Sequence, residues 1–382
     1  MKTEFESATE NAALKEAIVA RIRSEGALPF RDFMEAALYH PQHGYYRSRR
    51  EKMGREGDYL TSPEVSPIFG VLLGRQLREM WQALGEPHRF DVVEAGAGTG
   101  RLCGDILRWA RSHAPDLRGA LAYTIVEVSE APAERQRETL AEEGCDVHWS
   151  AELPETIEGC LLSNELLDSF PVHRVGVREG ALLEVFVAWE GVRFVEELRP
   201  PSTPELKAYF SRLGLLPGEG CSAEVNLAAL EWMQQAGRAL RSGFLLTLDY
   251  GYEASELYAP WREDGTLLCC HRHNAAADPY TRLGRQDITS HLDFTSLRRA
   301  GEASGLRTLG LVSQSEFLTN LGIAEAMAPP GEGDVDLEEY YARRRAVSEL
   351  IDPAALGRIR VLAQANGVRE PRLTGLLGGS NA

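Results

Sequence analysis

The sequence has no long hydrophobic run, no paired cysteine spacing and no excess of positive charge. Its apolar stretches are all shorter than the roughly eighteen residues of a membrane-spanning helix, so we expect no membrane insertion. The six cysteines show no C-x-x-C spacing, so neither a zinc site nor a disulfide framework is indicated, and we expect no metal. The formal net charge of −16 disfavours a nucleic-acid partner, because phosphates would be repelled on average.

Residues 1–23 also lack the basic segment and apolar core of a signal peptide. Together with the scattered cysteines, this absence predicts a cytoplasmic protein in a reducing compartment. The hydrophobic fraction of 43% and the charged fraction of 26% are those of a globular protein. At 382 residues, the chain is long enough for one large domain with insertions or for two packed domains.

Helical spacing of apolar residues opens the chain. It predicts helices over 11–24 and 30–38, followed by a loop of packed aromatic rings over 39–46. Thr61 or Ser62 could then cap a helix that runs to about Leu84.

From Phe90 the pattern alternates between strand and helix, which is typical of a parallel sheet covered by helices. The strands that we predict are 90–94, 121–127, 146–149, 159–164 and, after an excursion of about eighty residues, 244–249. The excursion is predicted to hold an antiparallel meander over 172–177, 182–189 and 192–198, and a helix over 223–240.

This pattern divides the chain into five predicted parts. They are an N-terminal helical region with a pocket loop (1–86), the first part of the sheet core (87–170), an inserted α+β substrate or lid subdomain (171–242), the second part of the core (243–325) and a C-terminal helical tail (326–382). Ligands of parallel sheets bind at the carboxyl edge, so we expect the insertion to form the roof of an acceptor pocket.

The strongest local motif is the glycine-rich turn Glu94-Ala-Gly96-Ala-Gly98-Thr-Gly100, because it follows an apolar strand and precedes an amphipathic helix. Such a turn lets backbone amides and the positive helix terminus approach a polar ligand. Dinucleotide binding is the competing interpretation, but that fingerprint needs a third glycine at position 101, which is Arg101.

A second polar cluster follows the fourth strand. Asn164, Glu165 and Asp168 lie at the predicted carboxyl edge, and the two acids would share a face if they stood on one helical turn. The alternative interpretation is that Asn164 caps a helix whose first turn carries acids, as the helix dipole favours.

Several blocks follow one another as in the MidA family, which the chain resembles from about residue 28 to about residue 320. These blocks are Leu38–Tyr46, Gly57–Gly70, the glycine turn, Asn164–Val172 and Gln286–Phe294. The resemblance implies a class I methyltransferase with a Rossmann-like, mostly parallel α/β sheet and helices on both faces, together with the N-terminal helical region and the inserted subdomain.

The resemblance also implies S-adenosylmethionine (SAM) as cofactor. It places the glycine turn at the amino-acid end of SAM, Glu94 against that turn or the methionyl ammonium, and Glu127 on both ribose hydroxyls. The full set of cofactor-binding residues implied is Glu94, Gly96, Gly98, Gly100, Glu127, Asn164, Ser62 and Pro63. The mitochondrial member of the family methylates an arginine of a respiratory complex I subunit, and the chain resembles a bacterial relative of it.

We therefore expect a protein or small-molecule methyl acceptor, with protein arginine as the first hypothesis. Glu165 and Asp168 would pair with the guanidinium, whereas an oxygen acceptor would need a base such as His291. A non-catalytic, SAM-binding assembly chaperone is the third alternative, and a homodimer is left open.

Overall fold

The computed structural model describes residues 10–47, 52–54, 57–141, 147–327 and 337–377. Its contacts divide the chain into two compact units. Unit 1 comprises residues 1–59, 167–232 and 251–297, and unit 2 comprises residues 60–166, 233–250 and 298–382. Each unit is described by itself.

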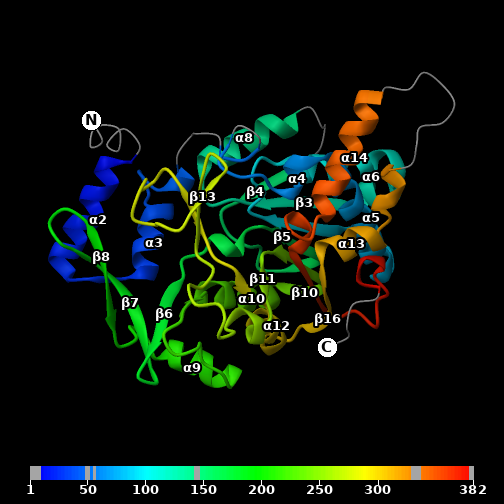
Figure 1. Cartoon of the computed structure of the whole chain (residues 1–382). Helices are drawn as coiled ribbons and strands as arrows, with labels where there is room; N and C mark the ends of the chain where they lie inside the picture. The colour runs from blue at the N-terminus through cyan, green and yellow to red at the C-terminus, as the bar shows by residue number, and fades with distance from the viewer. Residues whose placement is uncertain (1–9, 48–51, 55–56, 142–146, 328–336, 378–382) are drawn as a thin grey trace. The chain divides into compact units, whose positions relative to one another are not determined.

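Unit 2 is built on a sheet of seven described strands (Figure 1). From one edge to the other they are β16 (Arg307–Ser313), β17 (Arg360–Asn366), β10 (Leu240–Asp249), β5 (Ile157–Asn164), β2 (Phe90–Ala95), β3 (Leu121–Val126) and β4 (Val147–Ser150). The five strands from β10 to β4 are parallel, and β17 runs antiparallel to both of its neighbours.

The direction of chain progress reverses between β2 and β5. After β2 the chain proceeds outward to β3 and β4, then returns to the other side of β2 as β5. In open parallel sheets, ligands bind at the carboxyl ends of the strands at such a reversal. The glycine turn and the Asn164–Glu165 pair follow the strands at this point.

Alternation along the strands places every second side chain against one group of helices. Phe244, Leu246 and Leu248 of β10 are buried in this core, together with apolar residues of β2 and β5. The helices that contribute buried residues to this core include α5 (Pro67–Ala83), α6 (Arg101–His113), α7 (Pro115–Ala120), α8 (Glu130–Leu140), α13 (Gln314–Asn320) and α14 (Leu337–Ile351). The short helix α4 (Ser62–Val65) also lies in this unit, and α10 (Leu227–Ala239) and α12 (Phe294–Ala303) belong partly to each unit.

Two glycines allow β5 and β10 to approach closely. Gly159 and Gly243 are register partners on these strands, with φ of +154° and +131°. A Cβ on Gly243 would lie 1.9 Å from the carbonyl oxygen of Gly159, so this position accepts no side chain without a shift of backbone.

Unit 1 contains smaller sheets. One consists of β1 (Leu28–Pro29), β7 (Ala181–Trp189), β6 (His173–Arg178) and β9 (Ser222–Val225), with β8 (Phe194–Arg199) also on β7. The others pair β13 (Asn274–Ala276), β12 (Leu268–His271) and β14 (Asp287–Thr289), and β11 (Gly251–Tyr252) with β15 (Leu292–Asp293). The remaining helices of unit 1 are α2 (Ala12–Glu25), α3 (Phe30–Tyr39), α9 (Pro204–Leu213) and α11 (Ala254–Leu257).

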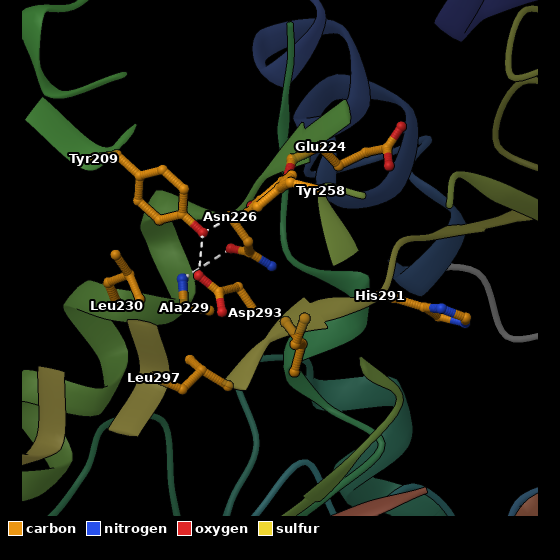
Figure 2. A pocket seen from close by; sticks show the side chains of 10 residues that line it. Tyr209, Glu224, Asn226, Ala229, Leu230, Tyr258, His291, Asp293 and Leu297 are labelled. Carbon is orange, nitrogen blue, oxygen red and sulfur yellow. Dashed lines mark hydrogen bonds between the residues drawn. The ribbon is translucent and has the colours of Figure 1, made fainter. Parts of the chain in front are cut away.

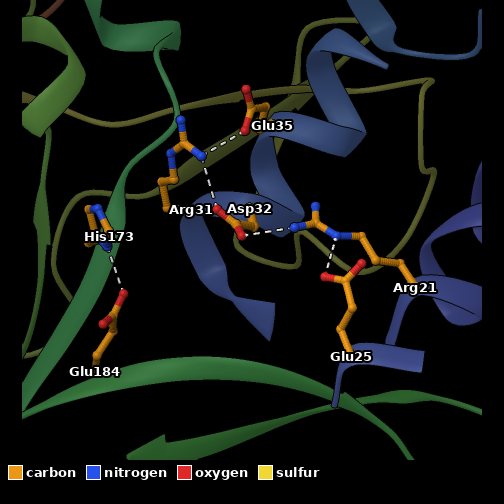
Figure 3. Close-up of polar contacts among 7 residues, drawn as sticks. All are labelled: Arg21, Glu25, Arg31, Asp32, Glu35, His173 and Glu184. Atoms are coloured by element: carbon orange, nitrogen blue, oxygen red, sulfur yellow. Dashed lines mark hydrogen bonds and ion pairs between the residues drawn. The ribbon is translucent and has the colours of Figure 1, made fainter. Parts of the chain in front are cut away.

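Charged side chains connect α2 to α3. Asp32 accepts hydrogen bonds from both Arg21 and Arg31, and each arginine also reaches a glutamate of its own helix (Figure 3). To the left of this group in the same view, His173 of β6 and Glu184 of β7 form a buried pair with 2.6 Å between Nδ1 and Oε1. Exposed pairs contribute little to stability, so the apolar core of α2, α3 and β7 holds these elements together.

The predicted meander and the parallel strands are confirmed, but three sequence predictions are wrong. The helix expected from Thr61 or Ser62 to Leu84 is broken after Val65, and Ser66 caps α5 by accepting the Ile68 N–H. The helix predicted over 223–240 begins only at Leu227, as α10, because residues 222–225 form β9, and the predicted helical tail contains α14 but also the strand β17. Asp146, the predicted start of the third strand, lies outside the described residues.

None of the described helices combines the length and the apolar character needed to cross a membrane.

Candidate functional site

The glycine turn closes β2 and opens α6. Gly96, Gly98 and Gly100 have φ of +70°, +56° and +83°, a region that side chains disfavour. Gly100 is the N-cap of α6 and offers no side chain to the first helical N–H groups. The first turn of a helix leaves its N–H groups without backbone partners, so this end of α6 can bind a polar ligand.

Glu94 lies under this turn in the helix-covered core. Its side chain is 3% exposed, and its Oε2 accepts a hydrogen bond of 2.7 Å from the Tyr123 hydroxyl of β3. Burial raises the pKa of Glu94 to about 7, although the hydrogen bond from Tyr123 acts in the opposite direction. Near neutral pH this carboxyl therefore changes charge readily when a cation approaches.

Glu127 follows β3 on the neighbouring strand. Its Oε1 accepts the Ser129 N–H at 2.9 Å, and its Oε2 accepts from the Gln136 side chain at 3.3 Å. The backbone N–H of Glu127 donates to Ser150 of β4, which fixes the start of this loop. These two hydrogen bonds orient the carboxylate.

The segment Ser62-Pro63-Glu64 forms the short helix α4 and contacts the glycine turn. Glu64 accepts a hydrogen bond from the Thr99 hydroxyl, and its other oxygen lies 3.1 Å from Nε of Arg101. Ser62 is fully buried, and its hydroxyl donates to Gln314 at 3.0 Å. The contact with the turn is therefore made by Glu64, which the sequence did not identify.

Asn164 ends β5, and Glu165 follows it. Oε1 of Glu165 accepts two hydrogen bonds of 3.1 Å, from the Ser62 N–H and from Nδ2 of Asn164. Burial, with a smaller contribution from the nearby Asp249 carboxylate at the end of β10, raises the pKa of Glu165 to about 8, although the hydrogen bonds from Ser62 and Asn164 act in the opposite direction. Oδ1 of Asn164 is buried and has no hydrogen-bond partner among the described residues.

The prediction that Glu165 and Asp168 share a helical turn is wrong. Glu165 has a left-handed φ of +49°, and its N–H donates to the Leu248 carbonyl at 2.8 Å. A non-glycine residue held there stores of the order of 1–3 kcal/mol of strain, which the surrounding hydrogen bonds must offset. Asp168 belongs instead to a short 3-10 helix, Leu167–Ser169.

Asp168 and His291 lie in unit 1. The Asp168 carbonyl accepts the Ser290 N–H at 2.9 Å, so its segment is joined to the residue before His291. Asp168 is 8% exposed. The His291 N–H donates to the Thr266 hydroxyl at 3.0 Å, and its ring centroid lies 5.3 Å from that of Tyr252.

A small pocket in unit 1 has His291 in its lining (Figure 2). Three of its lining residues are hydrogen-bonded to one another. The Tyr209 hydroxyl donates to the Asp293 carboxylate at 2.7 Å, and the Tyr258 hydroxyl lies 2.7 Å from the Tyr209 hydroxyl. Asp293 also accepts the Thr295 N–H at the start of α12. These polar groups satisfy one another, and Figure 2 shows the His291 ring directed away from them.

The structure thus brings most of the predicted cofactor residues to one edge of the unit 2 sheet, while Asp168 and His291 belong to unit 1. Sequence reasoning missed Glu64, Gln136, Tyr123 and Asp249. Asp249 is the last residue of the predicted strand 244–249, and Gln136 stands in a polar stretch of helix that gives no signal of burial.

Comparison with known proteins identifies the fold and the cofactor. The family described as "Putative S-adenosyl-L-methionine-dependent methyltransferase" matches residues 72–312. A crystal structure of a COG1565 superfamily member from Burkholderia thailandensis, bound to S-adenosyl-homocysteine, is 34% identical with a TM-score of 0.88. The alignment covers 96% of this chain and 95% of that chain.

Relatives with known names are also methyltransferases. The human protein arginine methyltransferase NDUFAF7, mitochondrial, is 30% identical over 80% of this chain and 72% of its own length. Its Drosophila melanogaster homolog is 29% identical over 94% of this chain and 86% of its own length. The predicted class I fold and the predicted cofactor are confirmed, and the chain belongs to this family of S-adenosyl-L-methionine-dependent methyltransferases.

Proposed function

We propose that this methyltransferase acts on an arginine side chain of a protein, with the reaction at the carboxyl ends of β2, β5 and β10. The curated relatives are named protein arginine methyltransferases, and this supports the same acceptor class here. A cytoplasmic location stays a prediction, which cell fractionation would test.

The residues at this edge fit the cofactor. The glycine turn has the positive φ values that permit close backbone approach, and the buried Oδ1 of Asn164 lacks a hydrogen-bond partner in the described part of the chain. Bound SAM supplies an electrophilic methyl group on a sulfonium. We propose that Gly96, Gly98 and Gly100 hold its amino-acid end.

The remaining cofactor contacts are assigned by position. Glu127 would accept the ribose hydroxyls, because its carboxylate is already oriented by Ser129 and Gln136. Glu94 would balance the methionyl ammonium through the turn. Ser62 and Pro63 would act from α4, Ser62 through its backbone because its hydroxyl is engaged with Gln314.

The observation that carries the acceptor assignment is the set of partners of the Glu165 carboxyl. Among the residues that the structure describes, this carboxylate accepts hydrogen bonds from two neutral groups and forms no ion pair. Burial raises its pKa to about 8, so a cation bound beside it would stabilise the charged form. A guanidinium would complement the Glu165 carboxylate, because it is positively charged and presents paired N–H donors in the plane of a carboxylate.

A bound guanidinium would lower the pKa of Glu165. The resulting carboxylate would hold positive charge on the nitrogens that it binds and leave more electron density on the attacking nitrogen. Nearby Asp249 adds negative charge at the same edge. We keep Asp168 as a second acceptor-side carboxylate and His291 as the base that an oxygen acceptor would require. Glu165 favours the arginine acceptor over the oxygen acceptor.

Methyl transfer into a lysate from cells lacking the protein tests the proposal. With SAM labelled in its methyl group, acid hydrolysis of the labelled protein should yield methylated arginine. Label in an ester, in lysine or in small molecules alone would overturn the arginine assignment.

Glu165→Gln should retain SAM binding and lose transfer. Glu158→Gln is the matched control, because this exposed glutamate lies near the amino end of the same strand. Equal turnover of the two variants would remove Glu165 from the acceptor site.

A further inference from the structure

Gln136 joins three parts of the cofactor edge through a single buried amide. It stands on α8, and its side chain is 0% exposed. Its Nε2 donates to the Gly98 carbonyl at 3.1 Å and to Oε2 of Glu127 at 3.3 Å. Its Oε1 accepts from the Trp149 indole at 3.1 Å. One side chain therefore links the glycine turn, the loop after β3 and strand β4.

The neighbours determine which way this amide faces. An indole N–H can only donate, so the atom that faces Trp149 must be the amide oxygen. The two amide protons are then directed at acceptors, a carbonyl oxygen and a carboxylate. The hydrogen-bonding pattern of the site fixes the orientation of Gln136.

The helix that carries Gln136 also lies close to the turn. A Cβ on Gly100 would be 3.4 Å from Cα of Gln136, at the tight end of ordinary contact. The missing side chain at Gly100 lets α8 approach to the distance at which a glutamine reaches Gly98 and Glu127 at once.

We infer that Gln136 is a positioning residue that sets the Glu127 carboxylate and the glycine turn relative to each other before the cofactor binds. This inference rests on the proposed role of Glu127 at the ribose. With one oxygen held by the Ser129 N–H and the other by Gln136, the carboxylate can accept two hydroxyls without reorganising. Gln136 thereby determines the preference for ribose over deoxyribose.

A purely structural role is the competing explanation, since burying a satisfied amide also stabilises a core. That role predicts lower stability but an unchanged preference between ligands. Gln364 is a matched control in the same unit. It is also 0% exposed, and its Nε2 donates to the Arg298 carbonyl and the Thr308 hydroxyl.

The experiment measures calorimetric Kd values for S-adenosyl-homocysteine and for its 2′-deoxyribose analogue. The wild type should prefer the ribose compound, and Gln136→Leu should reduce the ratio of the two Kd values by about fivefold or more. Gln364→Leu should lower the Tm and leave the ratio unchanged. Gln136→Met serves the same purpose if the leucine variant does not fold.

Glu127→Ala distinguishes a failure of the proposed role of Glu127 from a failure of the inference about Gln136. If the wild type shows no ribose preference, the role of Glu127 fails and the inference fails with it. If Glu127→Ala loses the preference while the Gln136 variants keep it, only the inference about Gln136 is overturned. Loss of the preference in both sets of variants, with Gln364→Leu unaffected, supports the inference.

Discussion

Replacing Glu94 with glutamine is expected to stabilise the protein at alkaline pH. Burial raises the pKa of this carboxyl from its ordinary value of 4.5 to about 7. For a group with a raised folded-state pKa, the stability contribution is complete below the unfolded pKa and is lost as pH rises through the folded pKa. The wild type should therefore lose stability between about pH 4.5 and pH 8.

The magnitude follows from the two pKa values. At about 1.4 kcal/mol for each pKa unit, the rise from 4.5 to about 7 costs the wild type about 3 kcal/mol above pH 8. Glutamine carries no charge at any of these pH values, and its amide oxygen can still accept from Tyr123. Urea unfolding should show the variant to be more stable by up to about 3 kcal/mol at pH 8.5 and within about 1 kcal/mol of wild type at pH 5.

Cofactor binding provides a second measurement of the same group. If Glu94 balances the methionyl ammonium, the bound cation lowers the pKa of Glu94 and binding near pH 7 releases a proton. Calorimetry in two buffers of different ionisation enthalpy measures that release, which Glu94→Gln should abolish. Unchanged proton release in the variant, or no gain in stability at pH 8.5, would refute the reasoning.

Three further predictions concern other residues. Gly98→Val should abolish SAM binding with the fold retained, because φ at this position is +56°; calorimetry with unchanged affinity would contradict the role of the turn. Glu127→Ala should weaken SAM by about 1.5–3 kcal/mol for each charge-assisted hydrogen bond lost, as titration calorimetry would show. Glu184→Gln should change the pH dependence of stability in the opposite direction to Glu94→Gln. Burial is outweighed there by hydrogen bonds from His173 and Ser202, so the pKa is lowered, and the wild type loses that stability as pH falls through the lowered pKa. Acid denaturation should show that the Glu184→Gln variant does not lose this part of its stability as pH falls.

The parallel part of the sheet could be predicted because its strands are short apolar runs that end in recognisable turns. β2 is followed by three glycines, and β5 by a polar cluster, so both sequence and structure mark the same edge. The acid after β3, Glu127, was proposed from the family resemblance. These features depend on local sequence, which is visible without the fold.

β17 was missed because its polar residues conceal its burial. Gln364 and Asn366 break the apolar pattern, yet the amide nitrogen of the buried Gln364 donates to the Arg298 carbonyl and to the Thr308 hydroxyl. Those partners are more than fifty residues away, and no local pattern indicates them. Gln136 was not predicted for the same reason, because its partners lie on the glycine turn, on the loop after β3 and on strand β4.

The left-handed Glu165 could not be foreseen either. Its conformation is imposed by hydrogen bonds to Leu248 and Ser62, which come from separate parts of the chain. Sequence spacing alone favoured a helical turn. The error matters because it changes which side chains can stand beside Glu165.

The position of β17 has a consequence for the order in which the protein is made. This strand lies between β10 and β16 in the sheet, although it is synthesised after both. While the ribosome is still translating residues 314–359, the edge of β10 that will receive β17 has no partner strand, and an open edge is a template for wrong pairing. The cofactor-binding sheet is therefore completed late in synthesis, and a nascent chain stalled before Arg360 carries every residue of the glycine turn without the finished sheet.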